Sequence, residues 1–246
     1  MAELVIYEKK ERIAYITLNR PSKLNAMNPE MSSELDKIWL DFQKDDNLWT
    51  AIITGAGKAF SSGVDVDDLD KDFPLSTPGL SVELDKPVIA AVNGYCLGIG
   101  FFITMYCDIR IAAEDAQFGY PEGKAGYTAG GASCLVGHMP TAVAMEMLLT
   151  GKYINARRAY EIGFVNAVVP SEQLMDEATK MAELVNGNAP LVNRALKKLI
   201  SKSYHPTPRE QGITYSRIVG LLRQSEDAAE GRRAFLERRK PLFKAR

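Results

Sequence analysis

The stretch PVIAAVNGYCLGIGFFITMYCD, from Pro87 to Asp108, constrains the fold of this chain more than any other. It carries no charged residue from Val88 to Cys107, and three glycines interrupt it. A membrane-spanning helix needs about 20 apolar residues, so the length alone would fit one. The glycines, Asn93 and the ordinary soluble composition of the rest of the chain favour a buried element of a soluble protein instead.

The order of residue types in this stretch predicts a strand, a turn and a helix. Val88 to Val92 is a short buried strand, residues 93–98 form a tight turn, and residues 99–107 form a buried helix. The first N–H groups of a helix lack intrahelical partners, so they can face a ligand oxygen that gains negative charge. Gly98 and Gly100 let the backbone approach closely. This stretch alone leaves open that its glycines only permit close helix packing.

A second glycine-rich turn favours the ligand-binding interpretation. The residues GAGKAFSSGVD, from Gly55 to Asp65, follow an apolar strand, Ala51 to Thr54, and Gly63 again exposes backbone amides. Two such turns can supply two N–H donors to one oxygen. This arrangement is an oxyanion hole.

Four stretches together resemble the crotonase (enoyl-CoA hydratase/isomerase) superfamily from end to end. They are the two glycine-rich turns, AQFGYPE at 116–122 and EGRRAFLERRKPLF at 230–243. The resemblance implies an α/β fold with a crotonase-type ββα spiral core over residues 1–189. It also implies a C-terminal helical region over residues 190–246, which in the family assembles trimers or dimers of trimers.

The resemblance further implies that the chain binds an acyl-CoA thioester. Lys23, Leu24 and Ala26 match the family segment that lies along the adenine and pantetheine of coenzyme A. The other expected substrate contacts are Ser61, Ser62, Gly63, Asp65, Val66, Leu97, Gly98, Phe102, Pro121 and Tyr127. Coenzyme A enters as part of the substrate, and no separate cofactor is expected.

The chemistry of a CoA thioester requires donors that hold its carbonyl oxygen, because the α-carbon becomes acidic only if that oxygen accepts charge. By resemblance the two donors are the backbone N–H groups of Val64 and Ile99, and one such donor contributes about 3–4 kcal/mol of transition-state stabilisation. Ile99 departs from the glycine that is usual in the family. Its side chain is tolerable if it points away from the substrate.

Glu122 is the expected acid/base. It follows Pro121 at the end of an apolar and aromatic run, where poor solvation raises the pKa of a carboxyl group toward working pH. Without the resemblance, a surface salt bridge with Lys124 would be the simpler interpretation. The match to the family favours catalysis.

Phe102 distinguishes among the reactions of the family. Hydratases of the family carry two glutamates that hold a water molecule, and Phe102 occupies the position of the first. Members with a single glutamate resemble Δ3-Δ2 enoyl-CoA isomerases, so isomerisation is the first expectation. The alternatives are a hydratase with another acid, such as Tyr127 or an aspartate of residues 65–72, a hydrolase or decarboxylase, and a scaffold without catalysis.

Composition disfavours several other kinds of partner. The net charge of −1 gives no general attraction to nucleic acid. The three cysteines form no C-x-x-C pair and the two histidines are isolated, so neither predicts a metal site. The aspartates between Asp65 and Asp72 do not match an EF-hand, and a solvated, mobile loop is expected there. Gly57-Lys58 and Gly98-Ile99-Gly100 fail the Walker A and Rossmann patterns. No secretory signal is visible, so a cytoplasmic location is expected. The resemblance to the crotonase superfamily implies a role in fatty acid metabolism.

The remaining elements follow from apolar periodicity and helix caps. Expected strands are residues 4–7, 12–18, 49–54, 109–112 and 164–169, the first two antiparallel. A helix begins at Asn28-Pro29 and buries Leu35, Ile38, Trp39 and Phe42. Further helices are expected over residues 141–149 (buried), 155–162, 172–185, 190–204, 208–223 and 227–239.

Overall fold

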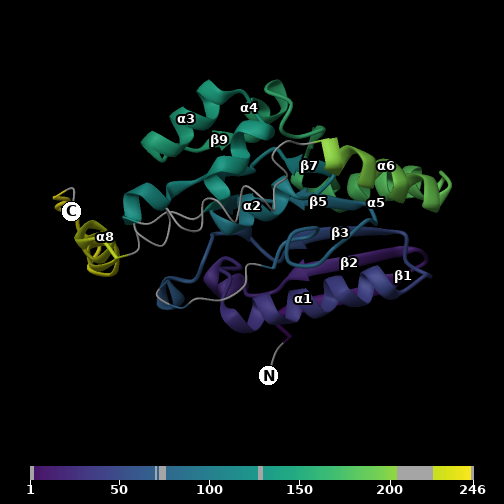
Figure 1. Ribbon diagram of the computed structural model, residues 1–246, viewed down its shortest axis with the longest axis horizontal. Helices are drawn as coiled ribbons and strands as arrows, with labels where there is room; N and C mark the ends of the chain where they lie inside the picture. Colours follow the sequence, from purple (N-terminus) through teal and green to yellow (C-terminus); the bar gives the residue numbers. More distant parts are fainter. Residues whose placement is uncertain (1–2, 70, 72–75, 127–129, 204–223, 245–246) are drawn as a thin grey trace.

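The computed structural model describes residues 3–69, 71, 76–126, 130–203 and 224–244 (Figure 1). Within these residues the strands form a larger sheet of six strands, in the order β1-β2-β3-β5-β7-β10, and a smaller sheet of four, in the order β4-β6-β8-β9. Every pairing in the larger sheet is parallel except that of β1 with β2. The strands of the larger sheet are Val5–Lys10, Ile13–Leu18, Thr50–Gly55, Val88–Val92, Ile109–Ala113 and Ala167–Val169.

The smaller sheet contains a strand that sequence periodicity did not predict. Its strands are β4 (Ala59–Ser61), β6 (Tyr95–Leu97), β8 (Gln117–Gly119) and β9 (Ile154–Asn155). The prediction of a tight turn over residues 93–98 was wrong, since β6 lies within that range and pairs in parallel with β4 and β8. Three residues are too few to show a strand period, so only the tertiary pairing reveals β6.

Helices cover both faces of the larger sheet (Figure 1). On one face β5 contributes Val88 and Val92 to a core that α1 (Pro29–Lys44) and α2 (Ile99–Met105) complete. On the other face Ile89 packs with residues of α5 (Leu174–Asn186). The predicted α/β fold is confirmed, and β5 is buried on both faces as expected for a central parallel strand.

The structure confirms the helix that was predicted to begin at Asn28-Pro29. Asn28 is the N-cap of α1, and its side chain accepts a hydrogen bond from the Met31 N–H at 3.0 Å. The predicted apolar stripe is buried, and consists of Leu35, Ile38, Trp39 and Phe42. The helix after Gly98 also forms, but it ends at Met105 rather than at Cys107.

The later helices agree with prediction in position more than in burial. They are α3 (Thr141–Thr150), α4 (Ala156–Glu161), α5, α6 (Pro190–Ser203) and α8 (Glu226–Leu236). Contrary to expectation, α3 is largely exposed: Leu149 is 77% exposed, and only Ala144 and Met147 are buried. The predicted last strand begins only at Ala167, and Phe164 instead packs against the rings of Phe101 and Phe118 with centroids 5.0 and 5.5 Å away. The helix expected over 208–223 lies outside the described residues.

Short 3-10 helices complete the chain, and two of them flank the glycine-rich turns. They are η1 (Pro21–Lys23), η2 (Val66–Asp68), η3 (Pro121–Ala125), η4 (Gly130–Gly137) and η5 (Ser171–Gln173). Among the described residues, no helix is long and apolar enough to cross a membrane. Figure 1 shows α6 and α8 at opposite ends of the molecule. The domain boundary near residue 190 stays a prediction.

Candidate active site

Three parallel strands of the smaller sheet end at the same place. The chain leaves β4 at Ser61 and reaches Gly63, leaves β6 at Leu97 and reaches Gly98, and leaves β8 at Gly119 and reaches Glu122. Because parallel strands share one carboxyl edge, these three exits meet there. Ligand sites of α/β proteins are found at such an edge.

Gly98 is where the three exits come closest. A Cβ atom on Gly98 would lie 2.4 Å from Oε1 of Glu122 and 3.4 Å from Cα of Gly63. Its φ of +53° and the φ of +113° at Gly63 also lie in the region that favours glycine. Only a residue without a side chain fits between the glutamate and the other turn.

The two expected amide donors lie beside these glycines. Ile99 is the first residue of α2, and Val64 follows Gly63. The Val64 turn is fixed by its neighbours, because the Met27 N–H donates to the Gly63 carbonyl and the Asp65 N–H to the Met27 carbonyl, both at 2.8 Å. Within the described part of the chain, neither the Val64 nor the Ile99 N–H has a backbone acceptor. Both amides therefore remain available to a ligand oxygen.

Glu122 has the most unusual environment of these groups. The residue is partly exposed, yet its Oε2 is buried and has no hydrogen-bond partner among the described residues. Burial raises the pKa of Glu122 to about 8, although contact with its own backbone N–H opposes this. The alternative of a salt bridge with Lys124 is wrong, since the Lys124 Nζ donates to the Gly151 carbonyl at 2.8 Å. A carboxyl group in this state can exchange a proton near neutral pH.

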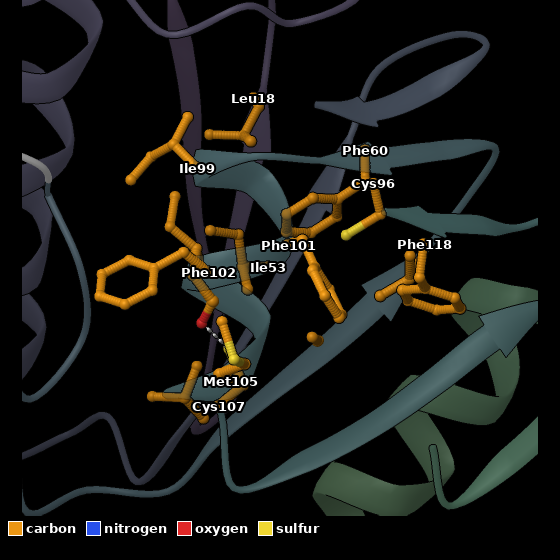
Figure 2. Packing of buried hydrophobic residues seen from close by; sticks show 14 of the residues in the cluster. Leu18, Ile53, Phe60, Cys96, Ile99, Phe101, Phe102, Met105, Cys107 and Phe118 are labelled. Carbon is orange, nitrogen blue, oxygen red and sulfur yellow. Dashed lines mark hydrogen bonds between the residues drawn. The ribbon is translucent and has the colours of Figure 1, made fainter. Parts of the chain in front are cut away.

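The side chain of Ile99 does not crowd the turn. It is buried in the core that α2 shares with the larger sheet, and Figure 2 shows it near Leu18. Close approach is required one residue later, because a Cβ on Gly100 would lie 2.6 Å from Cβ of Ser61. The departure from glycine at position 99 is thus accommodated by the core.

The Phe102 side chain is apolar and cannot hold a water molecule by hydrogen bonds. It is 7% exposed, and in Figure 2 its ring points away from the Phe101 and Phe118 rings. Its ring meets that of Tyr106 edge to face with centroids 4.9 Å apart. A Cβ on Gly131 would lie 2.4 Å from the Phe102 ring. No carboxylate stands at this position of α2.

The expected coenzyme A loop lies against the Gly63 turn. The Ser62 N–H donates to the Leu24 carbonyl at 2.9 Å, and the Ser62 hydroxyl donates to the Lys23 carbonyl at 3.4 Å. Leu24 adopts a left-handed conformation with φ of +50° and is exposed. Ala26 is buried just before the Met27 bridge. The structure thus brings these residues together, while their contact with coenzyme A stays a prediction.

Two residues of this loop were not predicted as contributors to the site. Arg20 pairs with Asp65 at 2.8 Å. Desolvation raises the pKa of Asp65, but the hydrogen bonds from Arg20 and the Asp67 N–H, together with the charges of Arg20 and Lys23, hold that pKa below its ordinary value. Asn25 is buried at φ of +55° and donates to the carbonyls of Ala56 and Ala59. Its position in a loop rich in turn residues was the available signal.

The remaining expected contacts lie around the same edge. The Ser61 hydroxyl accepts from the Gly63 N–H at 3.3 Å, and Leu97 is buried at the end of β6. Val66 begins η2 and Pro121 begins η3. Tyr127 lies outside the described residues.

The aspartates that follow the Gly63 turn are paired with cations. Asp67 contacts Lys23 at 3.1 Å, and Asp68 contacts Lys71 at 2.6 Å. In the parts of the chain that the structure describes, no three His, Cys, Asp or Glu side chains are grouped as metal ligands. The cysteines at 96, 107 and 134 are buried thiols, and among the described residues none of them forms a disulfide.

Comparisons with known proteins point to one family. The sequence profile of the enoyl-CoA hydratase/isomerase family matches residues 8–246. The chain is 39% identical to (E)-benzylidenesuccinyl-CoA hydratase of Thauera aromatica over 98% of each chain, and 40% identical to carnitinyl-CoA dehydratase of Escherichia coli O157:H7 over 100% of each. The crystal structure of carnitinyl-CoA hydratase from Mycobacterium avium superposes with a TM-score of 0.91 at 34% identity, covering 100% of both chains.

Proposed function

Since the chain belongs to the enoyl-CoA hydratase/isomerase family, the crotonase superfamily, we propose that it adds water to an enoyl-CoA thioester and catalyses the reverse dehydration. The observation that carries this proposal is the Glu122 carboxylate, which has an unpartnered buried oxygen and lies against Gly98. The relatives named hydratase and dehydratase support water addition over the isomerisation expected from Phe102.

In the dehydration direction one carboxylate suffices. Glu122 takes the α-proton of a 3-hydroxyacyl-CoA, and the electron pair of the C–H bond moves onto the thioester oxygen. The Val64 and Ile99 N–H groups hold that negative oxygen. The enolate then re-forms the carbonyl and the C–O bond at the β-carbon breaks. The departing hydroxyl takes the proton from Glu122 and leaves as water, so the carboxylate is regenerated.

The environment of Glu122 suits this shuttle. A pKa of about 8 makes its two protonation states similar in energy near neutral pH, so neither proton transfer is steeply uphill. The other carboxylates near the Gly63 turn are held by cations, because Asp65 pairs with Arg20 and Asp67 with Lys23. Among the described residues, Glu122 is therefore the acid/base that the chemistry favours.

Isomerisation is the second candidate, and Phe102 is the observation that favours it. Its ring stands where hydratases of the family, by resemblance, place a second glutamate. Isomerisation of a 3-enoyl-CoA uses the same enolate, but Glu122 returns the proton to the γ-carbon and no hydroxyl leaves. The two reactions differ only in whether water takes part.

Oxygen-18 labelling separates these reactions. The protein is incubated in H₂¹⁸O with crotonyl-CoA and, separately, with 3-hexenoyl-CoA, and products are analysed by mass. An ¹⁸O-labelled 3-hydroxyacyl-CoA supports hydration, whereas an unlabelled 2-enoyl-CoA formed faster than any hydrated product supports isomerisation. Release of free coenzyme A indicates a hydrolase. Thioesters that bind but stay unchanged indicate a scaffold and overturn the proposal.

The amide donors are tested by Val64→Pro, which deletes one N–H group. Because this N–H has no backbone acceptor among the described residues, its loss breaks no hydrogen bond of the fold. Turnover is expected to fall by about 10²–10³-fold. Thermal unfolding of the variant verifies that it is folded, and wild-type turnover in a folded variant would reject the assignment.

We also propose that the chain forms a homo-oligomer, a trimer or a dimer of trimers, through α6. The supporting observation is that the apolar side chains of Leu191, Leu196 and Ile200 are exposed. Light scattering of Leu196→Glu tests this. A smaller particle than wild type is expected, with exposed Glu161→Gln as a control that leaves the mass unchanged.

A further inference from the structure

The turn that carries Glu122 is in contact with the C-terminal helix α8. Gly126 caps η3 with φ of +66°, and its N–H donates to the carbonyls of Glu122 and Gly123. A Cβ on Gly126 would lie 2.4 Å from the Asp227 carbonyl oxygen and 3.1 Å from Cα of Gly231. The two backbones therefore touch with no side chain between them.

Helix α8 presents small residues where it is buried. Its buried residues are Gly231 and Ala234, whereas Phe235 and Leu236 are exposed. A glycine inside a helix costs about 0.5–1 kcal/mol relative to alanine. Close approach to Gly126 is the structural gain that offsets this cost. Ser225 caps the helix, and its hydroxyl accepts from the Ala228 N–H at 3.0 Å.

The Glu122 turn has little support of its own. η3 is a five-residue 3-10 helix, a type of helix with weak hydrogen-bond geometry. Its external supports are α8 at Gly126 and the end of α3, where the Lys124 Nζ donates to the Gly151 carbonyl at 2.8 Å. The position of Glu122 is consequently set by what packs against the turn.

We propose that Gly126 and Gly231 are positioning residues, and that the seating of α8 on the Glu122 turn holds the carboxylate against Gly98. This inference rests on the proposed role of Glu122 as acid/base. A turn displaced from α8 would move Oε1 away from Gly98 and admit water to Oε2. Misplacement of a catalytic group by 1 Å can cost about 10²-fold in rate.

Gly231→Val in the full-length chain tests the proposal, because Gly231 is buried with its Cα beside Gly126, so that a valine side chain has little room there. We expect kcat to fall by roughly 10–100-fold while KM for the CoA thioester changes by less than about threefold. Hydration of the carboxylate lowers its pKa, so the rise of kcat/KM with pH moves from near 8 toward lower pH. A merely structural role would leave that pH profile in place. Gly137→Ala is the matched control, because a Cβ on Gly137 meets nothing within 4 Å.

Ser225 offers a gentler variant if Gly231→Val fails to fold. Ser225→Ala removes the cap of α8, and Ser225→Asp restores one. We expect a loss of kcat of roughly two- to fivefold in Ser225→Ala and its recovery in Ser225→Asp, since a lost cap weakens the first turn of α8. Equal kcat values for these two variants would count against α8.

Hydrogen exchange of the peptide over residues 121–126 reports on the turn without substrate. Faster exchange in Gly231→Val or Ser225→Ala than in Gly137→Ala supports the seating of α8. Unchanged exchange together with unchanged kcat overturns the inference and leaves the proposed function intact. A wild-type protein that turns over no thioester, but whose turn exchanges faster in the α8 variants, overturns the proposed function alone.

Discussion

Two ionisable side chains lie next to the ends of strands, one in each sheet, and they differ in their hydrogen bonding. Lys86 precedes β5 in the larger sheet, is 2% exposed, and its Nζ donates to the carbonyls of Phe42 at 2.8 Å and Asp45 at 2.7 Å. Glu122 follows β8 in the smaller sheet, and its Oε2 is buried without a partner. The Lys86 ammonium group thus has two carbonyl acceptors, whereas Oε2 of Glu122 has no partner among the described residues.

This difference in hydrogen bonding distinguishes Lys86, a structural charge, from Glu122, the proposed reactive group. Lys86 ties the end of α1 to the start of β5, and its own carbonyl accepts from Lys197 of α6 at 2.8 Å. Burial lowers the pKa of Lys86, and the nearby Arg194 lowers it further. A buried polar group with satisfied partners stabilises a fold, whereas an unsatisfied one costs stability and marks a functional site. Substitutions at the two residues should therefore affect different properties.

The largest effect is expected from Glu122→Gln. Glutamine keeps the size of glutamate but cannot accept a proton, so kcat should fall by about 10²–10⁴-fold. The free energy of unfolding at pH 7 should stay the same or rise, because glutamine removes the cost of burying a carboxyl group whose pKa is raised to about 8. Steady-state kinetics and urea unfolding measure the two quantities. Full turnover in this variant would remove Glu122 from the mechanism.

Lys86→Met should give the reverse pattern. It leaves two helix-end carbonyls without their donor, and each unsatisfied buried group costs about 1–3 kcal/mol, so a loss of about 3–4 kcal/mol of unfolding free energy is expected. The folded fraction should turn over substrate at the wild-type rate. Exposed Lys44→Met, on the same helix, is the control. A variant with wild-type stability would show that Lys86 is not structural.

The pH dependence of stability sharpens the contrast. The pKa of Glu122 is raised in the folded chain to about 8 from 4.5, so the folded state binds more protons between these values. Stability from this group is then greatest below pH 4.5 and is lost as pH rises through 8. Between pH 5 and 7.5 wild type should lose roughly 2–3 kcal/mol relative to Glu122→Gln. Parallel curves for the two proteins would contradict the raised pKa.

The smallest effect is expected at the ion pairs around Lys86. Arg194 pairs with Asp85 at 2.9 Å, and its side chain is partly exposed. Arg194→Met should cost at most about 1 kcal/mol, and less at high salt, because such pairs are screened. Unfolding midpoints at low and high ionic strength measure this. A larger loss would mean that α6 depends on this pair for docking.

Local signals explain what could be predicted from the sequence. Asn28-Pro29 and the stripe from Leu35 to Phe42 predicted α1, because a cap and its helix are adjacent in the chain. The glycine-rich turns at Gly63 and Gly98 were recognised for the same reason. The poor solvation of the Glu122 carboxyl group was only an expectation from the sequence. It depends on a contact with Gly98, which is distant in the chain.

Long-range contacts escaped prediction altogether. The role of Lys86 depends on carbonyls at the end of α1, and Gly126 meets Gly231 across about a hundred residues. Neither contact leaves a period or a spacing in the sequence. The short β6 was missed because three residues carry too little pattern to show a strand.

Because three strand ends converge at this site, its parts can change separately during evolution. The turn at Gly63, the turn at Gly98 and the proposed acid/base Glu122 each follow a different strand of the smaller sheet. Each can vary while the strands that present the other two stay paired. Ile99 and Phe102 are examples, because by resemblance both depart from the family pattern, and both side chains are buried in the core. New reactions can therefore arise by single substitutions, without an intermediate that has lost its fold.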